Sequence, residues 1–305
     1  MDFLLVAQSK AATIAGCRRR VSSPTVPGRR QVHKTVTTSE AASFRRIILD
    51  HYRTQGRRLP WRETRDPYAI LVSEIMLQQT QVDRVREKYL EFLAVFPTWQ
   101  ELAGAELSRV LSLWQGLGYN RRAVSLQLCA RAVLQRFGGA LPEEVERLES
   151  LPGIGPYTAR AVAAFAFGLA TPFIETNIRS VFIHHFFADA EAVRDAEILP
   201  LVEFTLDRDN PRDWYYALMD YGAMLKRGGA NPGRKSAHHV RQSPFRGSNR
   251  EQRSLILKRI LAQPGLSIAR LEETLSLDAA SLARNIAQLE REGLIRQEEG
   301  RLWVP

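Results

Sequence analysis

The segment Leu151–Ala159, LPGIGPYTA, constrains the fold of this chain more than any other. It separates two amphipathic stretches that read as helices, and its two glycines and two prolines interrupt both patterns. Gly153 and Gly155 permit positive φ and close approach of another backbone, and Pro156 suits the first turn of the second helix. The turn amides and the helix N-terminus then predict a site for a phosphate. A tight corner between two helices, with no ligand, is the alternative.

Nearly every segment of residues 43–225 reads as a helix with defined ends. Asp66 supplies an N-cap and Pro67 a first-turn proline, and Thr98 opens a capping box. No segment there has the alternation of a strand. The sequence therefore predicts an all-α domain of about ten helices, with the bounds 41–225.

The pattern changes after a basic loop at 226–250. Three short helices are predicted next, and the segment Leu294–Val304 reads as two short strands around Glu299-Gly300. Three helices and a small hairpin are typical of a winged-helix domain, which we place at 251–305. The predicted helices are 251–262, 267–275 and 279–292.

The net charge of +10 is unevenly distributed. Residues 1–40 carry +5 and the loop 226–250 carries +7, whereas 41–225 carry −2 and 251–305 are neutral. This concentration favours a polyanionic partner. Residues 1–40 are interpreted as a disordered basic tail; a DNA-binding arm, a transit peptide and a misassigned start remain open.

The cysteine count excludes several classes of site. Cys17 and Cys129 are the only cysteines, too few for a disulfide framework or a four-cysteine metal or iron–sulfur site. The pair His238-His239 without further ligands does not predict a metal site. No apolar run reaches the roughly 18 residues of a membrane span.

Glu74 is the first candidate catalytic residue. Its helical neighbours Ile70, Leu71 and Leu77 form a mostly apolar face. A carboxyl group there loses hydration, so its pKa should rise and its neutral form should serve as a general acid. A solvated glutamate at the helix edge is the alternative.

Five segments in register carry a resemblance to a known family. They are LPWR (Leu59–Arg62), DPYAILVSEIMLQQTQV (Asp66–Val82), LWQGLGY (Leu113–Tyr119), LPGIGPYTA and MDYGAM (Met219–Met224). On these segments the chain resembles the helix-hairpin-helix DNA glycosylase superfamily, and within it the adenine glycosylases of the MutY type more than the endonuclease III branch. The resemblance implies a two-lobed all-α glycosylase domain that acts on double-stranded DNA.

The resemblance implies roles for two carboxylates. The glutamate at the place of Glu74 protonates the adenine leaving group, and the N-glycosidic bond then breaks through a cationic sugar. An aspartate that stabilises this cation is expected in FIETNIRSV (Phe173–Val181), where this chain has Glu175. The extra methylene shifts the charge by roughly 1.5 Å. We expect the backbone to compensate; a differently shaped active site and low activity are the alternatives.

Tyr157 predicts a monofunctional enzyme. Bifunctional relatives have a lysine here that forms a Schiff base, which a phenol cannot do. A core aromatic is the alternative role for Tyr157. Tyrosine also occurs here in relatives that remove thymine opposite guanine, so the choice of base stays open.

Gln78, Gln79 and Tyr119 are expected to contact DNA. The two amides would fill the space left by an extruded base, with Tyr119 stacked beside them. The Gln-Gln-Thr sequence resembles adenine glycosylases more than thymine ones, and Glu74 suits a purine that needs a proton. Adenine is therefore favoured.

Two parts common in the family are missing. No cysteine follows MDYGAM, so we expect no iron–sulfur cluster and no other cofactor. In its place we expect a loop whose cations contact the DNA backbone. The loop cations are Lys226, Arg227, Arg234, Lys235, Arg241 and Arg246.

The C-terminal domain with which adenine glycosylases inspect 8-oxoguanine is replaced here by the predicted winged helix. In its candidate recognition helix, Arg284, Asn285 and Gln288 are offset by Glu290 and Glu292, so DNA contact, protein docking and a structural role all stay open.

These observations favour a monofunctional glycosylase of base excision repair that removes adenine opposite guanine or 8-oxoguanine. Removal of thymine or uracil opposite guanine is one alternative, and a catalytically inactive DNA-binding protein is another. A bifunctional lyase conflicts with Tyr157. We expect a cytoplasmic, nucleoid-associated monomer that binds mismatched or damaged double-stranded DNA and no membrane.

Overall fold

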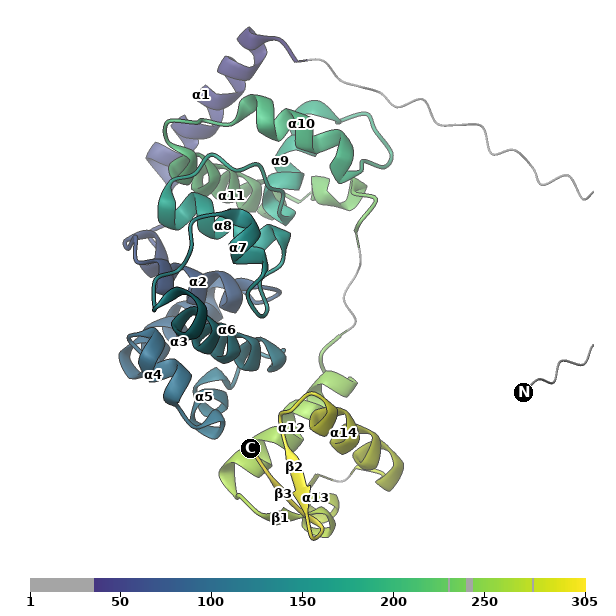
Figure 1. Ribbon diagram of the computed structural model, residues 1–305. Coiled ribbons are helices and arrows are strands. Elements are labelled where there is room, and N and C mark those ends of the chain that lie inside the picture. Colours follow the sequence, from purple (N-terminus) through teal and green to yellow (C-terminus); the bar gives the residue numbers. More distant parts are fainter. Residues whose placement is uncertain (1–35, 230, 240–243, 276) are drawn as a thin grey trace, which may run out of the picture. The chain divides into compact units, whose positions relative to one another are not determined.

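The computed structural model describes residues 36–229, 231–239, 244–275 and 277–305 (Figure 1). The predicted tail 1–40 lies mostly outside these ranges. Its last residues begin the first helix, because the Thr37 hydroxyl and the Glu40 carboxylate form a reciprocal capping box. Within the described ranges, every helix is too short or too polar to cross a bilayer.

Helices make up nearly all of the described chain up to residue 229. The prediction of an all-α domain is confirmed, and Asp66, Thr98 and Gly138 delimit helices as their residue types suggest. The helices are α1 Thr38–Gln55, η1 Pro60–Arg62, α2 Pro67–Leu77, α3 Val82–Val95, α4 Trp99–Gly104, α5 Leu107–Trp114, α6 Arg121–Phe137, α7 Val145–Glu149, α8 Pro156–Phe167, α9 Thr176–Phe186, α10 Asp195–Thr205 and α11 Pro211–Arg227.

The helices pack as two groups. Helices α2 to α8 contact one another, with α2 packed against α3, α6 and α8. Helices α1, α9, α10 and α11 form the second group, and α11 also contacts α8. This arrangement agrees with the two-lobed fold that the family resemblance implies.

Helix α2 is the central element of the first group. Every residue from Tyr68 to Met76 is buried, so the helix has no solvated face. A helix that is apolar all round belongs in the interior of a protein. Glu74, the one carboxylic acid on this helix, is therefore carried into the core.

Helices α9 and α11 approach each other closely at Gly222. A Cβ atom placed there would lie 2.4 Å from the backbone oxygen of Asn177, in the first turn of α9. The missing side chain therefore fixes how near α11 lies to the start of α9.

The segment after α11 is less of a loop than predicted. Helix α11 extends to Arg227, so Lys226 and Arg227 belong to its last turn, and a short helix η2 follows at Pro232–Lys235. Val193 pairs with Ser236, and η2 packs on α9. The segment is therefore held against the second group of helices.

The C-terminal domain has the predicted order of elements with one addition. The extra strand β1 has only two residues, too few for alternation to show in the sequence. The three strands form an antiparallel sheet in the order β1-β3-β2. The elements are α12 Asn249–Ala262, β1 Leu266–Ser267, α13 Ile268–Leu275, α14 Ala279–Arg291, β2 Arg296–Glu298 and β3 Arg301–Trp303.

Asn285, on the candidate recognition helix, is buried. It is 2% exposed, and its amide donates to Gln252 and to the backbone of Ser281. Of the roles left open for this helix, Asn285 therefore has a structural one. Its role is to tie α14 to α12.

Replacing Gly222 with alanine should lower the free energy of unfolding by about 1–3 kcal/mol, because the new methyl group collides with backbone. Gly104→Ala is the matched control, since a Cβ at Gly104 meets no atom within 4 Å. Urea unfolding of the two variants measures the difference. Equal stabilities would show that the α9–α11 distance is not set at Gly222.

Candidate active site

Glu74 is buried in the core on α2. It is 5% exposed, and its neighbours Ile70 and Leu71 are almost fully covered. Burial raises the pKa of Glu74 to about 7; the nearby charge of Glu175 also raises it, while a Tyr157 hydrogen bond and Arg62 lower it. The predicted burial is confirmed, and the group can hold a proton near neutral pH.

Tyr157, in the first turn of α8, faces Glu74. Its hydroxyl donates a hydrogen bond of 3.1 Å to Oε2 of Glu74, and its ring packs edge-on against Phe173. Burial raises the pKa of Tyr157 well above its ordinary value, and the charges of Glu74 and Glu175 add to the shift. The phenol therefore remains a donor. The carboxyl group is oriented by a partner from another helix.

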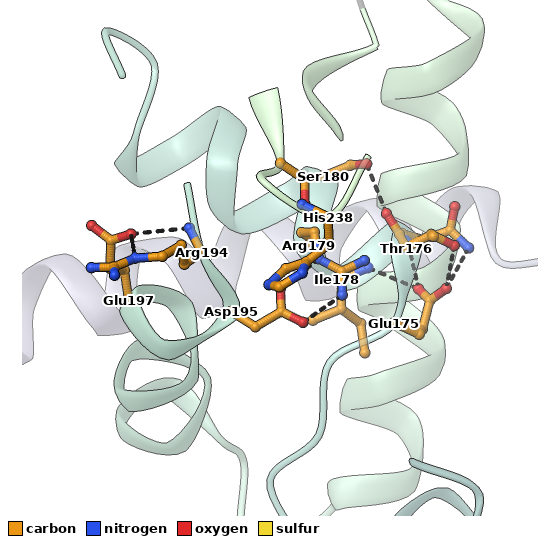
Figure 2. Close-up of polar contacts among 11 residues, drawn as sticks. Glu175, Thr176, Ile178, Arg179, Ser180, Arg194, Asp195, Glu197 and His238 are labelled. Atoms are coloured by element: carbon orange, nitrogen blue, oxygen red, sulfur yellow. Dashed lines mark hydrogen bonds and ion pairs between the residues drawn. The ribbon is translucent and has the colours of Figure 1, made fainter. Parts of the chain in front are cut away.

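Glu175 caps the N-terminus of α9. Figure 2 shows its carboxylate folded back on the first turn of the helix, where Oε1 accepts from the backbone N–H of Asn177 at 2.6 Å and of Ile178 at 2.8 Å. Oε2 accepts from the side chains of Thr176 and Asn177. The longer Glu175 side chain therefore folds back to cap its own helix, as the shorter Asp66 does on α2.

Lys226 and Asn177 extend this hydrogen-bond system to α11. The Lys226 ammonium donates to Oδ1 of Asn177 at 2.8 Å, so the Asn177 amide group is free to donate to Oε2 of Glu175 at 3.2 Å. Burial lowers the pKa of Lys226, and the charge of Glu175 raises it. Sequence reasoning assigned Lys226 to the DNA backbone and missed Asn177, which stands two residues after Glu175.

A second buried charge cluster lies beside Glu74. Both carboxylate oxygens of Asp220 accept hydrogen bonds from the Arg62 guanidinium at 2.8 Å, and Arg57 adds contacts through its backbone and side chain. The Arg62 guanidinium also lies over the Tyr216 ring at 4.4 Å. Arg62 and Asp220 stand in the LPWR and MDYGAM segments, which was the available signal, but sequence reasoning gave neither a role.

The two glycines of the hairpin differ. Gly153 has φ +79°, and a Cβ there would lie 2.6 Å from the Cβ of Ser125, so its backbone conformation and the packing against α6 both require glycine. Gly155 has φ −94°, and the expectation of positive φ at this residue is wrong. A Cβ at Gly155 would meet nothing within 4 Å. The exposed side of the turn at Gly155 is thus open to an external group.

Arg122 holds the predicted DNA-contacting turns together. Gln79 and Tyr119 both have positive φ, 55° and 49°, which is strained for non-glycine residues. The buried Arg122 guanidinium joins the two turns, and burial lowers its pKa to about 10. It donates to the backbone oxygens of Ile75, Met76, Gln78, Leu117 and Gly118 and to the Thr80 hydroxyl.

The predicted contact residues are not equally available. Gln79 and Tyr119 are exposed, and the Tyr119 hydroxyl accepts a hydrogen bond of 2.9 Å from Arg250. The less exposed Gln78 donates its amide to the Thr158 hydroxyl at 3.1 Å. Arg227, Arg234 and Arg246 are exposed, but the Lys235 ammonium donates to the backbone oxygen of Ala188. Arg241 lies outside the described residues.

Comparison with known proteins shows which family this chain belongs to. The profile described as "HhH-GPD superfamily base excision DNA repair protein" matches residues 72–199. The thymine/uracil-DNA glycosylase of Methanothermobacter thermautotrophicus is 30% identical over 192 residues, which are 62% of this chain and 87% of that protein. The chain belongs to the HhH-GPD superfamily.

Other members of the superfamily are similar as well. The human adenine DNA glycosylase is 38% identical over 199 residues, 61% of this chain and 36% of that protein. The solved structure of a thermostable thymine-DNA glycosylase has a TM-score of 0.55 at 28% identity, with 61% of this chain and 87% of that chain covered. This chain spans 36–61% of the length of the adenine DNA glycosylases that it matches.

The residues of this chain do not fit the iron–sulfur cluster of its family. Cys129 is the one cysteine in the described ranges; it is buried on α6, where burial raises its pKa to about 12. Within those ranges, no three or more histidine, cysteine or carboxylate side chains gather as metal ligands. No step of the chemistry is therefore assigned to a cluster.

Glu74→Gln should change stability in a pH-dependent way. The unfolded chain ionises Glu74 near its ordinary pKa of 4.5, whereas the folded protein keeps the proton to about 7, so the wild type loses stability as the pH rises between these values. Glutamine has no such loss. The stability of the variant relative to wild type should grow by up to about 3 kcal/mol from pH 4 to pH 8 in urea unfolding. A difference independent of pH would contradict the raised pKa.

Arg122→Met should destabilise the protein by about 3 kcal/mol, because it leaves several buried carbonyl oxygens without a donor. Arg131→Met on the same helix is the control: Arg131 is exposed and donates one hydrogen bond, to Ala103. Its cost should stay below about 0.5 kcal/mol. Equal losses in thermal unfolding would remove the role given to Arg122.

Proposed function

We propose that this chain is a monofunctional DNA glycosylase of base excision repair. It hydrolyses the N-glycosidic bond of a mispaired base, with adenine opposite guanine or 8-oxoguanine favoured. The observation that carries the proposal is the buried Glu74 carboxyl, held by the Tyr157 hydroxyl and within electrostatic range of Glu175. Membership of the HhH-GPD superfamily supports it.

The reaction begins with the proton on Glu74. An extruded base that reaches the Glu74 carboxyl group accepts this proton as its bond to the sugar breaks, because a neutral carboxyl group in a dry site is a general acid. The Tyr157 hydrogen bond keeps Oε2 of Glu74 in a fixed direction. The leaving base departs neutral.

Glu175 acts on the sugar. The bond breaks towards a cationic sugar, which a fixed carboxylate stabilises, as in other glycosidic hydrolyses. Two backbone amides hold one oxygen of Glu175, and Asn177 and Thr176 hold the other. A water molecule then adds to the sugar cation and gives up a proton, which returns Glu74 to its neutral form. Since Tyr157 is a phenol, no Schiff base forms at this position, and the strand with its abasic site stays intact.

DNA contact is proposed at three places. The open side of the turn at Gly155 accepts a backbone phosphate at the N-terminus of α8. Gln79 and Tyr119 enter the space left by the extruded base, in turns that Arg122 holds in place. Arg234, an exposed cation on η2, adds an electrostatic contact.

The choice of base rests on Glu74. A purine has ring nitrogens that accept a proton as it leaves, which suits a buried acid with a pKa of about 7. Thymine or uracil opposite guanine is the second candidate, since a thymine/uracil-DNA glycosylase is also a relative. An inactive DNA-binding protein is less well supported, because it needs no acid buried on an apolar helix.

Labelled duplexes with A:G, A:8-oxoguanine, T:G and U:G pairs should separate these functions. The protein should cleave an adenine-containing duplex only after hot alkali treatment, because it leaves an abasic site and no strand break. Alkali-dependent cleavage of T:G or U:G alone would move the substrate to pyrimidines. No cleavage of any duplex would favour an inactive DNA-binding protein.

Glu74→Gln should slow single-turnover excision by about 100-fold or more while DNA affinity changes little, because glutamine has no proton to give. Glu175→Gln should slow it by about 100-fold, since the charge opposite the sugar is lost. Glu175→Asp is the control that keeps a capping carboxylate, and it should stay within about tenfold of wild type. Unchanged excision by Glu74→Gln would remove Glu74 from the mechanism.

A further inference from the structure

A cavity of about 490 Å³ lies beside the Glu175 cap. Its walls come from the connection between α1 and η1, the start of α3, Asn177 of α9 and the last turns of α11. Asn177 also donates to Glu175. The cavity therefore adjoins the place where the proposed reaction holds the sugar.

The cavity is strongly cationic. Arg57, Arg58, Arg86, Lys226 and Arg227 line it, and Asp83 is its one acidic lining residue. Arg57 is paired with Asp220 outside the cavity lining, and Lys226 bonds to Asn177.

Among the residues that the structure describes, three of these cations have no partner for their side chains. Arg58, Arg86 and Arg227 are exposed, and none has a hydrogen bond or ion pair with any residue that the structure describes. They come from three separate elements, so their gathering is a product of the fold and not of one helix face. Like charges brought together repel unless an anion lies among them.

The position of these charges makes an anion necessary for the proposed chemistry. A cationic sugar next to Glu175 would be destabilised by an unneutralised group of arginines on the other side of Asn177. A phosphate group is bonded to the sugar through its 3′ and 5′ oxygens. The phosphates bonded to the reacting sugar are thus the anions nearest to this cavity in the proposed complex.

We propose that this cavity binds the phosphodiester group next to the extruded nucleotide. The inference rests on the proposed glycosylase function and adds a second phosphate site to the one at Gly155. Arg58, Arg86 and Arg227 contact the phosphate oxygens, as guanidinium groups do with phosphates. Lys226 connects the phosphate to Asn177 and through it to Glu175, so that correct seating of the strand orients the catalytic carboxylate.

The test uses the full chain and an uncleavable duplex that contains 2′-fluoro-deoxyadenosine opposite 8-oxoguanine. Arg58→Ala/Arg86→Ala should weaken binding about tenfold at low salt and make the slope of log affinity against log salt shallower by about 0.9, the value for one lost phosphate contact. Arg46→Ala is the control: Arg46 is an exposed arginine on α1 outside the cavity, and its slope should equal that of wild type. Circular dichroism checks that the double variant is folded.

A second readout separates the phosphate from other occupants. Single-turnover excision by the double variant should be slower than wild type, because the sugar is less well placed. An unchanged salt slope with a faster rate would show that the cavity holds no phosphate and that its charges oppose the reaction. An unchanged slope with a slower rate would place the base or another group there, and either result overturns the proposal.

Two further measurements distinguish a DNA phosphate from a soluble one, and failure of the phosphate site from failure of the glycosylase function. Titration of wild type with inorganic phosphate and with deoxyadenosine monophosphate should show only weak binding; submillimolar binding with an unchanged DNA slope would assign the cavity to a soluble phosphate and overturn the proposal. If wild type excises no base while the double variant shows the shallower slope, the phosphate site stands and the glycosylase function fails.

Discussion

The burial of Glu74 is the constraint on which the rest of the site depends. Helix α2 is covered on all sides, so a carboxyl group in its middle loses water, and its neutral form is favoured up to a pKa of about 7. A charge without a partner there would be costly. The fold lowers this cost with one hydrogen bond from Tyr157 and with the nearby Arg62 guanidinium, which Asp220 holds in place.

The second group of helices supplies a carboxylate, Glu175, to complement the neutral carboxyl group of Glu74. Glu175 stands at a helix N-terminus whose amides favour an anion, and Gly222 lets α11 lie close enough to α9 for Lys226 to reach Asn177. The short helix η2, which follows α11, packs onto α9. On the same helix, Arg179 forms an ion pair with Asp195 of α10, as Figure 2 shows. Acid and anion are thus held by different helices, each in the environment that its protonation state requires.

The sequence predicted those features that depend on local chemistry. Asp66, Pro67 and the hairpin prolines mark helix ends because capping is a short-range effect, and the burial of Glu74 follows from its three aliphatic neighbours. Long-range partners were missed. Arg122 bonds to carbonyl oxygens as many as 47 positions away, and Asp220 meets arginines about 160 positions away, which no local pattern records. The structural role of Asn285 could not be read from the sequence, because its partner, Gln252, lies on another helix.

The central claim is that Glu74 keeps its proton near neutral pH inside the folded chain. Carbon-13 NMR of side-chain carboxyl groups, with Glu74→Gln to assign the resonance, measures this directly. The account predicts a titration midpoint near pH 7 for Glu74. A midpoint near 4.5 would show a solvated carboxylate and would contradict the proposed acid.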